Sequence, residues 1–80
     1  NNSINININL KIDSNNYNLS QKLEKILNNF ELINSYEIKY IDSKNIIYKI
    51  TYNGLPDKLK EYLKSNNFKI DNSNDIWDLK

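Results

Sequence analysis

Few residues of this chain could do chemistry. It has no His and no Cys, the side chains that most often serve as nucleophiles, bases and zinc ligands. Their absence excludes a Ser-His or Cys-His nucleophile, the usual zinc sites and a thiol redox centre. The single glycine, Gly54, cannot supply the glycine-rich loops that bind phosphates. We therefore expect a protein that is not an enzyme and that binds no cofactor.

Three aspartates near the end of the sequence are the remaining candidates for chemistry. Asp71, Asp75 and Asp78 lie close together, and carboxylates at such spacing can bind calcium. Their segment, DNSNDIWD, lacks the glycine and the distal glutamate of an EF-hand loop. We interpret it as a solvated acidic turn and predict no metal site.

Composition restricts the chain to one small domain, residues 1–80, without a strong attraction to any partner. Eleven basic and ten acidic residues leave a net charge of +1, so no global field draws in nucleic acid or an anionic membrane. The abundant Asn, Lys, Ile and Tyr have A/T-rich codons, which indicates genome composition. No apolar run reaches the roughly 18 to 20 residues that span a bilayer. Because residue 1 is Asn and not Met, we expect a segment of a longer protein.

Two hydrophobic periods alternate along the chain and predict six elements. Period-two alternation predicts strands, and apolar residues spaced three and four apart predict helices. Asn18 and Gln21 resemble a capping box at the start of the first helix. Gly54 and Pro56 mark the change from a strand to the second helix. The predicted strands cover residues 3–12, 35–42, 46–52 and the short pieces 68–70 and 76–79; the predicted helices cover residues 18–30 and 56–65.

This order predicts an α+β fold of the ferredoxin-like βαββαβ type. We expect a two-layer sandwich with a four-stranded antiparallel sheet and both helices on one face. Tyr36, Ile38 and Tyr40 are assigned to the face under the helices. The other face is predicted to be open and polar. Its candidate interaction residues are Asn5, Asn7, Asn9, Lys11, Lys39, Ile41, Ile47 and Lys49.

The same topology occurs in the RNA-recognition motif, which stacks bases on aromatic residues of its open sheet face. None of the residues predicted for the open face is aromatic, and only Lys11, Lys39 and Lys49 are candidate RNA contacts. We therefore expect no nucleic acid partner and keep RNA binding as a weaker alternative.

The second half of the chain resembles a known family. The pattern YKITYNGLPDKLKEYLKSNNFKI followed by IWDL is similar to the bacterial domain of unknown function 2066. The resemblance implies a noncatalytic module of a larger, envelope-associated bacterial protein, with no functional residues to carry over. The compartment, envelope or periplasm against cytoplasm, stays open.

Together these observations favour a noncatalytic interaction or assembly module. Its partner would be a neighbouring domain or protein subunit, met through the open face or an edge strand. The oligomeric state stays open, and Ile41 and Ile47 are the predicted contact patch. The alternative from a different class is a small-molecule-sensing regulatory domain, which rests on analogy of fold.

Overall fold

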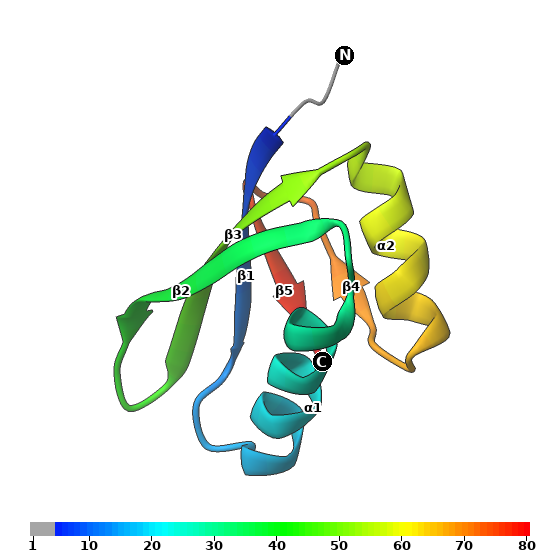
Figure 1. The fold of residues 1–80 in the computed structure, drawn as a ribbon. Coiled ribbons are helices and arrows are strands. Elements are labelled where there is room, and N and C mark those ends of the chain that lie inside the picture. Colours follow the sequence, from blue (N-terminus) through cyan, green and yellow to red (C-terminus); the bar gives the residue numbers. More distant parts are fainter. Residues whose placement is uncertain (1–4) are drawn as a thin grey trace.

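A computed structural model describes residues 5–80 of the chain as five strands and two helices (Figure 1). Asn1–Ile4, which include the predicted start of the first strand at Ser3, lie outside the described residues. The elements in chain order are β1 (Asn5–Asp13), α1 (Tyr17–Asn29), β2 (Ile33–Ile41), β3 (Asn45–Asn53), α2 (Pro56–Ser65), β4 (Ile70–Asp71) and β5 (Ile76–Leu79).

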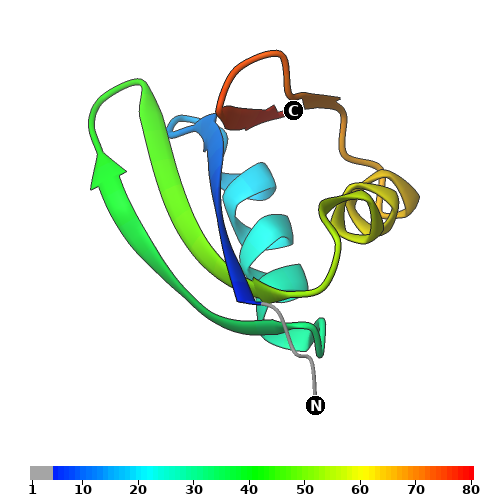
Figure 2. The same cartoon turned by 90° about the horizontal axis from the view of Figure 1, so that it is seen from above.

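The predicted α+β class is confirmed, but the predicted four-stranded antiparallel sheet is wrong. The sheet has five strands in the order β2-β3-β1-β5-β4. β1 pairs antiparallel with β3 and parallel with β5, so the sheet is mixed. Figure 2 shows the sheet bending around the two helices, which lie together inside the bend.

The C-terminal hairpin explains the difference from the predicted sheet. The two apolar pieces around the acidic turn form two antiparallel strands, β4 and β5, and not one interrupted strand. β5, and not β4, lies beside β1. Trp77 lies opposite Leu10 in the register, and both are buried. The two-residue β4 is left at the edge.

The core lies between one face of the sheet and the apolar stripes of the helices. Leu19 and Leu23 of α1 and Leu59 and Leu63 of α2 are buried. The sheet contributes a buried row from β1 and another from β3, formed by Ile8, Leu10, Ile12, Ile46, Tyr48, Ile50 and Tyr52. The strict alternation of these rows leaves the intervening residues on the opposite face.

Aromatic stacking joins the end of α1 to α2. The rings of Phe30 and Tyr62 are nearly parallel, with centroids 3.9 Å apart. Lys22 of α1 places its ammonium 4.3 Å from the ring centroid of Phe68, just after α2. The residues that follow each helix therefore contact the other helix.

The boundaries of the helices follow local hydrogen bonding. α1 is capped by Asn16, whose side chain accepts a hydrogen bond from the Leu19 N–H at 3.0 Å, and not by the predicted Asn18. α2 begins at Pro56 as predicted, and Asn67 after it adopts a left-handed φ of 71°. Gly54 has a φ of 150°, a conformation that residues with a Cβ rarely adopt.

Two β-bulges in β2 change which side chains share a face. The register is irregular between Ile33 and Ser35 and between Ile38 and Tyr40. Beyond the second bulge Tyr40 lies opposite Ile47, and Ile41 lies opposite Ile46. Paired residues point to the same face, so Tyr40 belongs to the open face and Ile41 to the helix side. Both assignments made from the sequence are therefore wrong, because strict alternation does not account for an extra residue.

Candidate interaction surface

Six of the eight predicted interaction residues share the open face of the sheet. Asn5, Asn7, Asn9 and Lys11 project from β1, and Ile47 and Lys49 project from the neighbouring β3. Asn5 and Asn7 are exposed, and the other four are half-buried. The remaining two are displaced by the second bulge: Ile41 lies on the helix side, and Lys39 is in the bulge itself.

β5 adds two residues to the open face that were not predicted. Ile76 lies opposite Asn9, and Asp78 lies opposite Lys11. The sequence does indicate a strand whose side chains alternate between two faces, at Ile76, Trp77, Asp78 and Leu79. Its place beside β1 could not be read from that alternation.

Most polar groups of the open face already contact one another. The Lys11 ammonium lies 3.7 Å from the Asp78 carboxylate, and the Lys49 ammonium lies 3.7 Å from that of Glu37. The Thr51 hydroxyl donates to the Asn7 side-chain oxygen at 3.3 Å. These internal contacts leave few groups free to recognise a ligand.

An aromatic residue stands at the margin of the open face. The bulge places Tyr40 there, 52% exposed, where the sequence predicted none. Its hydroxyl donates to the Asp42 carboxylate at 3.0 Å, and this hydrogen bond raises the pKa of Tyr40. One edge aromatic does not form the row of stacking rings that single-stranded nucleic acid uses.

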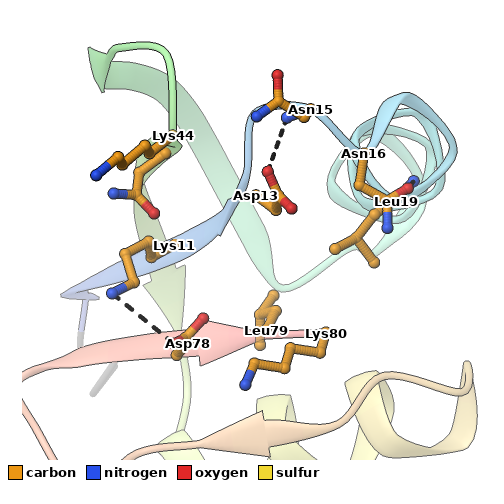
Figure 3. Close-up of a pocket in the computed structure, with 10 residues that line it drawn as sticks. Lys11, Asp13, Asn15, Asn16, Leu19, Lys44, Asp78, Leu79 and Lys80 are labelled. Atoms are coloured by element: carbon orange, nitrogen blue, oxygen red, sulfur yellow. Dashed lines mark hydrogen bonds and ion pairs between the residues drawn. The ribbon is translucent and has the colours of Figure 1, made fainter.

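A polar hollow of about 490 Å³ lies where β1 and β5 end near the start of α1 (Figure 3). Three lysines, Lys11, Lys44 and Lys80, and two aspartates, Asp13 and Asp78, line it. Lys11 is paired with Asp78, and Asp13 accepts a hydrogen bond from the Asn15 N–H at 2.8 Å. The charges are therefore nearly balanced.

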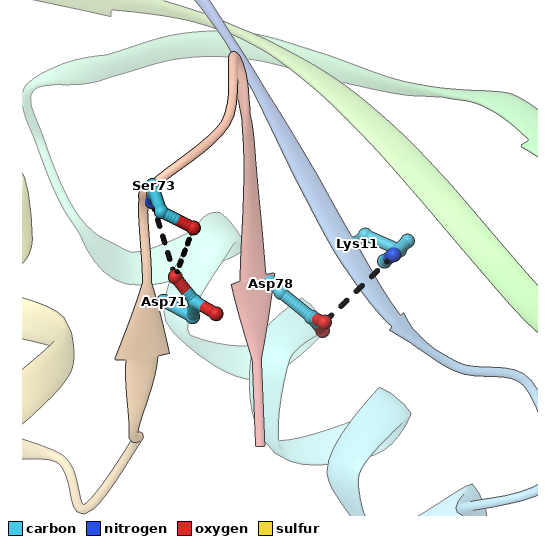
Figure 4. A network of polar contacts seen from close by, with 4 residues as sticks. All are labelled: Lys11, Asp71, Ser73 and Asp78. Carbon is cyan, nitrogen blue, oxygen red and sulfur yellow. Dashed lines mark hydrogen bonds and ion pairs between the residues drawn. The ribbon is translucent and has the colours of Figure 1, made fainter.

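The acidic turn lines a second hollow, of about 550 Å³. The Asp71 carboxylate accepts hydrogen bonds from the Ser73 hydroxyl at 2.8 Å and from the Ser73 N–H at 3.1 Å (Figure 4). These hydrogen bonds lower the pKa of Asp71. In residues 5–80 no three acidic side chains converge in a way that could hold a metal ion. The hydrogen bonds between Asp71 and Ser73 order the turn between β4 and β5.

The pKa of Tyr48 departs strongly from its ordinary value. Its ring is fully buried under α1, and its hydroxyl donates to the Glu24 carboxylate at 2.7 Å. Burial raises the pKa of Tyr48 to about 12; the contact with the Ser20 hydroxyl opposes this shift, and the hydrogen bond to Glu24 adds to it. The neutral Tyr48 hydroxyl therefore links β3 to α1 through its hydrogen bond to Glu24.

The outer edge of β2 is unpaired by any described strand. β2 is the first strand of the sheet order, and its nine residues pair only with β3. Figure 1 shows the β2–β3 hairpin extending past the helices. The backbone N–H and C=O groups along this edge are a template for another strand.

Apolar side chains are exposed on the outer half of β2. Ile38 is 49% exposed and Ile41 is 60% exposed, and both lie on the helix side of the sheet. Polar residues of α1 cover two neighbouring tyrosines, Tyr36 and Tyr48. Asn28 accepts a hydrogen bond from the Tyr36 hydroxyl at 3.1 Å, and Glu24 accepts one from the Tyr48 hydroxyl. α1 leaves Ile38 and Ile41 partly uncovered beside the free edge.

Comparisons with protein-family models, curated proteins and solved structures found no match to this chain. Within residues 5–80, neither helix has the length and apolar character needed to cross a membrane.

Proposed function

We propose that this domain is a noncatalytic interaction module that meets a partner through the β2–β3 hairpin. The observation that carries the proposal is the free edge of β2 with Ile38 and Ile41 exposed beside it. Partner strands add to such edges through backbone hydrogen bonds, and neighbouring side chains supply specificity.

The bulges of β2 support this assignment of the surface. Irregularities near Asn34 and Lys39 interrupt the edge, and such bulges limit uncontrolled edge-to-edge aggregation. The apolar side chains between and beyond them are nevertheless retained at the surface. The edge of β2 therefore resists nonspecific aggregation but keeps apolar side chains at the surface, which suits binding to a specific partner.

The setting of the module is also part of the proposal. The resemblance to the bacterial domain of unknown function 2066 supports a place inside a larger bacterial protein of the envelope. The partner would be a neighbouring domain or subunit. The nearly balanced charge favours neither nucleic acid nor a lipid surface.

A small-molecule sensor is the second candidate, favoured by the hollow near the start of α1. Its volume of about 490 Å³ is within the range of ligand pockets, but its lining is mostly polar and charged. A thermal-shift screen against metabolites tests it, since a specific ligand must raise the melting temperature.

The interaction proposal is tested by removing the exposed isoleucines. We expect Ile38→Ser with Ile41→Ser to abolish cross-linked complexes of the protein at its natural length in its host cells. The free energy of unfolding should change by less than about 1 kcal/mol, because Ile38 is 49% exposed and Ile41 is 60% exposed. Size-exclusion chromatography checks the same loss.

Leu55→Ser is the matched control, because Leu55 is 71% exposed but lies before α2, away from the hairpin. It should leave the complexes intact. Unchanged complexes in the double variant, or a natural-length protein whose domain forms no complexes, would contradict the proposal.

A further inference from the structure

We infer that the free edge of β2 accepts an extended segment of another protein with an apolar–basic–apolar pattern. The inference rests on the proposed function and specifies the partner's chemistry. It concerns the four residues Ser35–Ile38, which lie between the two bulges. Three observations support the inference: the free backbone groups of this segment, the side chains beside them and the poor fit of a second copy.

The backbone groups of Tyr36 and Ile38 point to the free edge. The Asp42 N–H donates to the Asn45 oxygen at 2.9 Å, and the Asn53 N–H donates to the Leu32 oxygen at 2.8 Å. The odd-numbered residues of β3 therefore direct their polar groups toward β2. Their partners between the bulges are Ser35 and Glu37. Because polar groups alternate along an antiparallel strand, those of Tyr36 and Ile38 face outward.

β3 shows which side chains fit beside this segment. Opposite Tyr36, Glu37 and Ile38 it places Ile50, Lys49 and Tyr48. A strand on the free edge would meet the same three side chains of β2 from the other side. It would therefore place apolar residues beside Tyr36 and Ile38, and a basic residue beside Glu37.

Glu37 is available for such a charge pair. Its side chain is 67% exposed, and its ion pair with Lys49 occupies only the side toward β3. Ile38, 49% exposed on the opposite face, would be covered by the same added strand. One added strand thus satisfies the backbone, the charge and the apolar surface together.

A second copy of this chain fits the edge poorly. The antiparallel register that pairs Tyr36 with the second copy's Ile38 places the two Glu37 side chains directly opposite each other. Like charges at that position are destabilising. The register centred on Ile38 places Glu37 opposite Lys39, but the bulge between Ile38 and Tyr40 interrupts the ladder there. The register centred on Tyr36 places Glu37 opposite Ser35, but it pairs Ile38 with Asn34, where the bulge between Ile33 and Ser35 interrupts the ladder. The occupant is therefore a different chain.

The test uses the 80-residue protein and an acetylated peptide that copies Asn45–Asn53. We expect the peptide to slow hydrogen exchange of the Tyr36 and Ile38 amides at least tenfold, as measured by NMR. The Glu37 amide, already directed toward β3, should change little. This internal control separates edge pairing from nonspecific adsorption.

Charge reversal tests the partner's chemistry. A peptide with Lys49→Glu should bind the native protein roughly two- to fivefold more weakly, as expected for an exposed cross-strand charge pair. It should bind the Glu37→Lys protein more tightly than the original peptide does. Glu37→Gln, which should bind both peptides alike, controls for the lost ion pair with Lys49, and melting temperatures confirm that each variant is folded.

Three results would overturn the inference: fast exchange of the Tyr36 and Ile38 amides with peptide present, no change of preference on charge reversal, or protection that grows with protein concentration alone. The last result would identify a second copy as the occupant. If the Ile38 and Ile41 variant loses its complexes while the peptide has no effect, the proposed function stands and this inference fails.

Discussion

Two tyrosines of β3 differ in what their hydroxyl groups contact. Both rings are fully buried, but of the two hydroxyls only that of Tyr48 has hydrogen-bond partners, the Glu24 carboxylate and the Ser20 hydroxyl. The Tyr52 hydroxyl is buried without a hydrogen bond among the described residues, close to Gly54. A buried hydroxyl without a partner costs free energy, whereas a paired one stabilises. The two sites therefore allow a matched comparison.

We expect Tyr48→Phe to lower the free energy of unfolding by about 1 to 2 kcal/mol, and Tyr52→Phe to leave it unchanged or raise it. Urea titrations at neutral pH measure both. Equal losses in the two variants would contradict the assigned roles.

The pKa of Tyr48 also predicts an alkaline limit to stability. The unfolded tyrosine loses its proton near its ordinary pKa of 10, but the folded one does so at about 12. The unfolded state then binds fewer protons, so stability is complete below pH 10 and falls as the pH rises toward 12. Burial raises the pKa of Tyr52 in the same direction. Tyr48→Phe should therefore flatten part of this decline in melting temperature.

At the scale of elements, the start of α1 shows how much of a helix boundary can be predicted from local sequence. The apolar spacing predicted a helix over residues 18–30, and Leu19, Leu23, Ile26 and Leu27 are its buried side chains, because helical period is a property of the sequence. The cap was not predicted correctly, because Asn15, Asn16 and Asn18 all have suitable side chains. In the preceding turn, the Asp13 carboxylate accepts a hydrogen bond from the Asn15 N–H. This turn places Asn16, and not its neighbours, beside the free N–H groups at the start of α1.

The cap assignment predicts unequal effects of two similar substitutions. Asn16→Ala should lower the free energy of unfolding by about 1 kcal/mol, since it removes the hydrogen bond to the Leu19 N–H. Asn18→Ala should change it by less than about 0.5 kcal/mol, because Asn18 is exposed inside the helix. Thermal unfolding of both variants measures the difference, and a larger loss for Asn18→Ala would refute the observed cap.

The candidate surface was predictable only where strands are regular. Along β1 and β3 strict alternation placed six residues correctly on the open face. Along β2 it failed for Tyr40 and Ile41, because a bulge depends on the partner strand and on the bend of the sheet. Ile38, which carries the proposal, lies on the helix side as assigned but is 49% exposed, because the sequence does not show where α1 stops covering the hairpin.

At the scale of the whole molecule, the position of β5 is the main departure from the ferredoxin-like prediction. It lies between β1 and β4, so Trp77 is a buried residue of an interior strand. Pairing between strands far apart in sequence depends on which apolar rows fit together in three dimensions. No local pattern in residues 68–79 carries that information.

The interior position of β5 predicts a large effect at its aromatic residue. Trp77→Ala should lower the free energy of unfolding by about 3 to 5 kcal/mol, whereas Ile76→Ala on the open face should cost about 1 kcal/mol. Denaturant unfolding compares the two. Similar losses would indicate that β5 contributes no more to the core than an edge strand does.

The same strand sets a constraint on how the chain folds during its synthesis. β1 pairs on one side with β3, in the middle of the sequence, and on the other with β5, nearly the whole chain away. Until residues 76–79 have left the ribosome, one edge of β1 has no strand to pair with, and the Leu10 side of the core is open. Contacts so distant in sequence form slowly. A nascent chain that stalls before Ile76 would therefore present a second unpaired edge, one without bulges, and would be the form most exposed to chaperones and proteases.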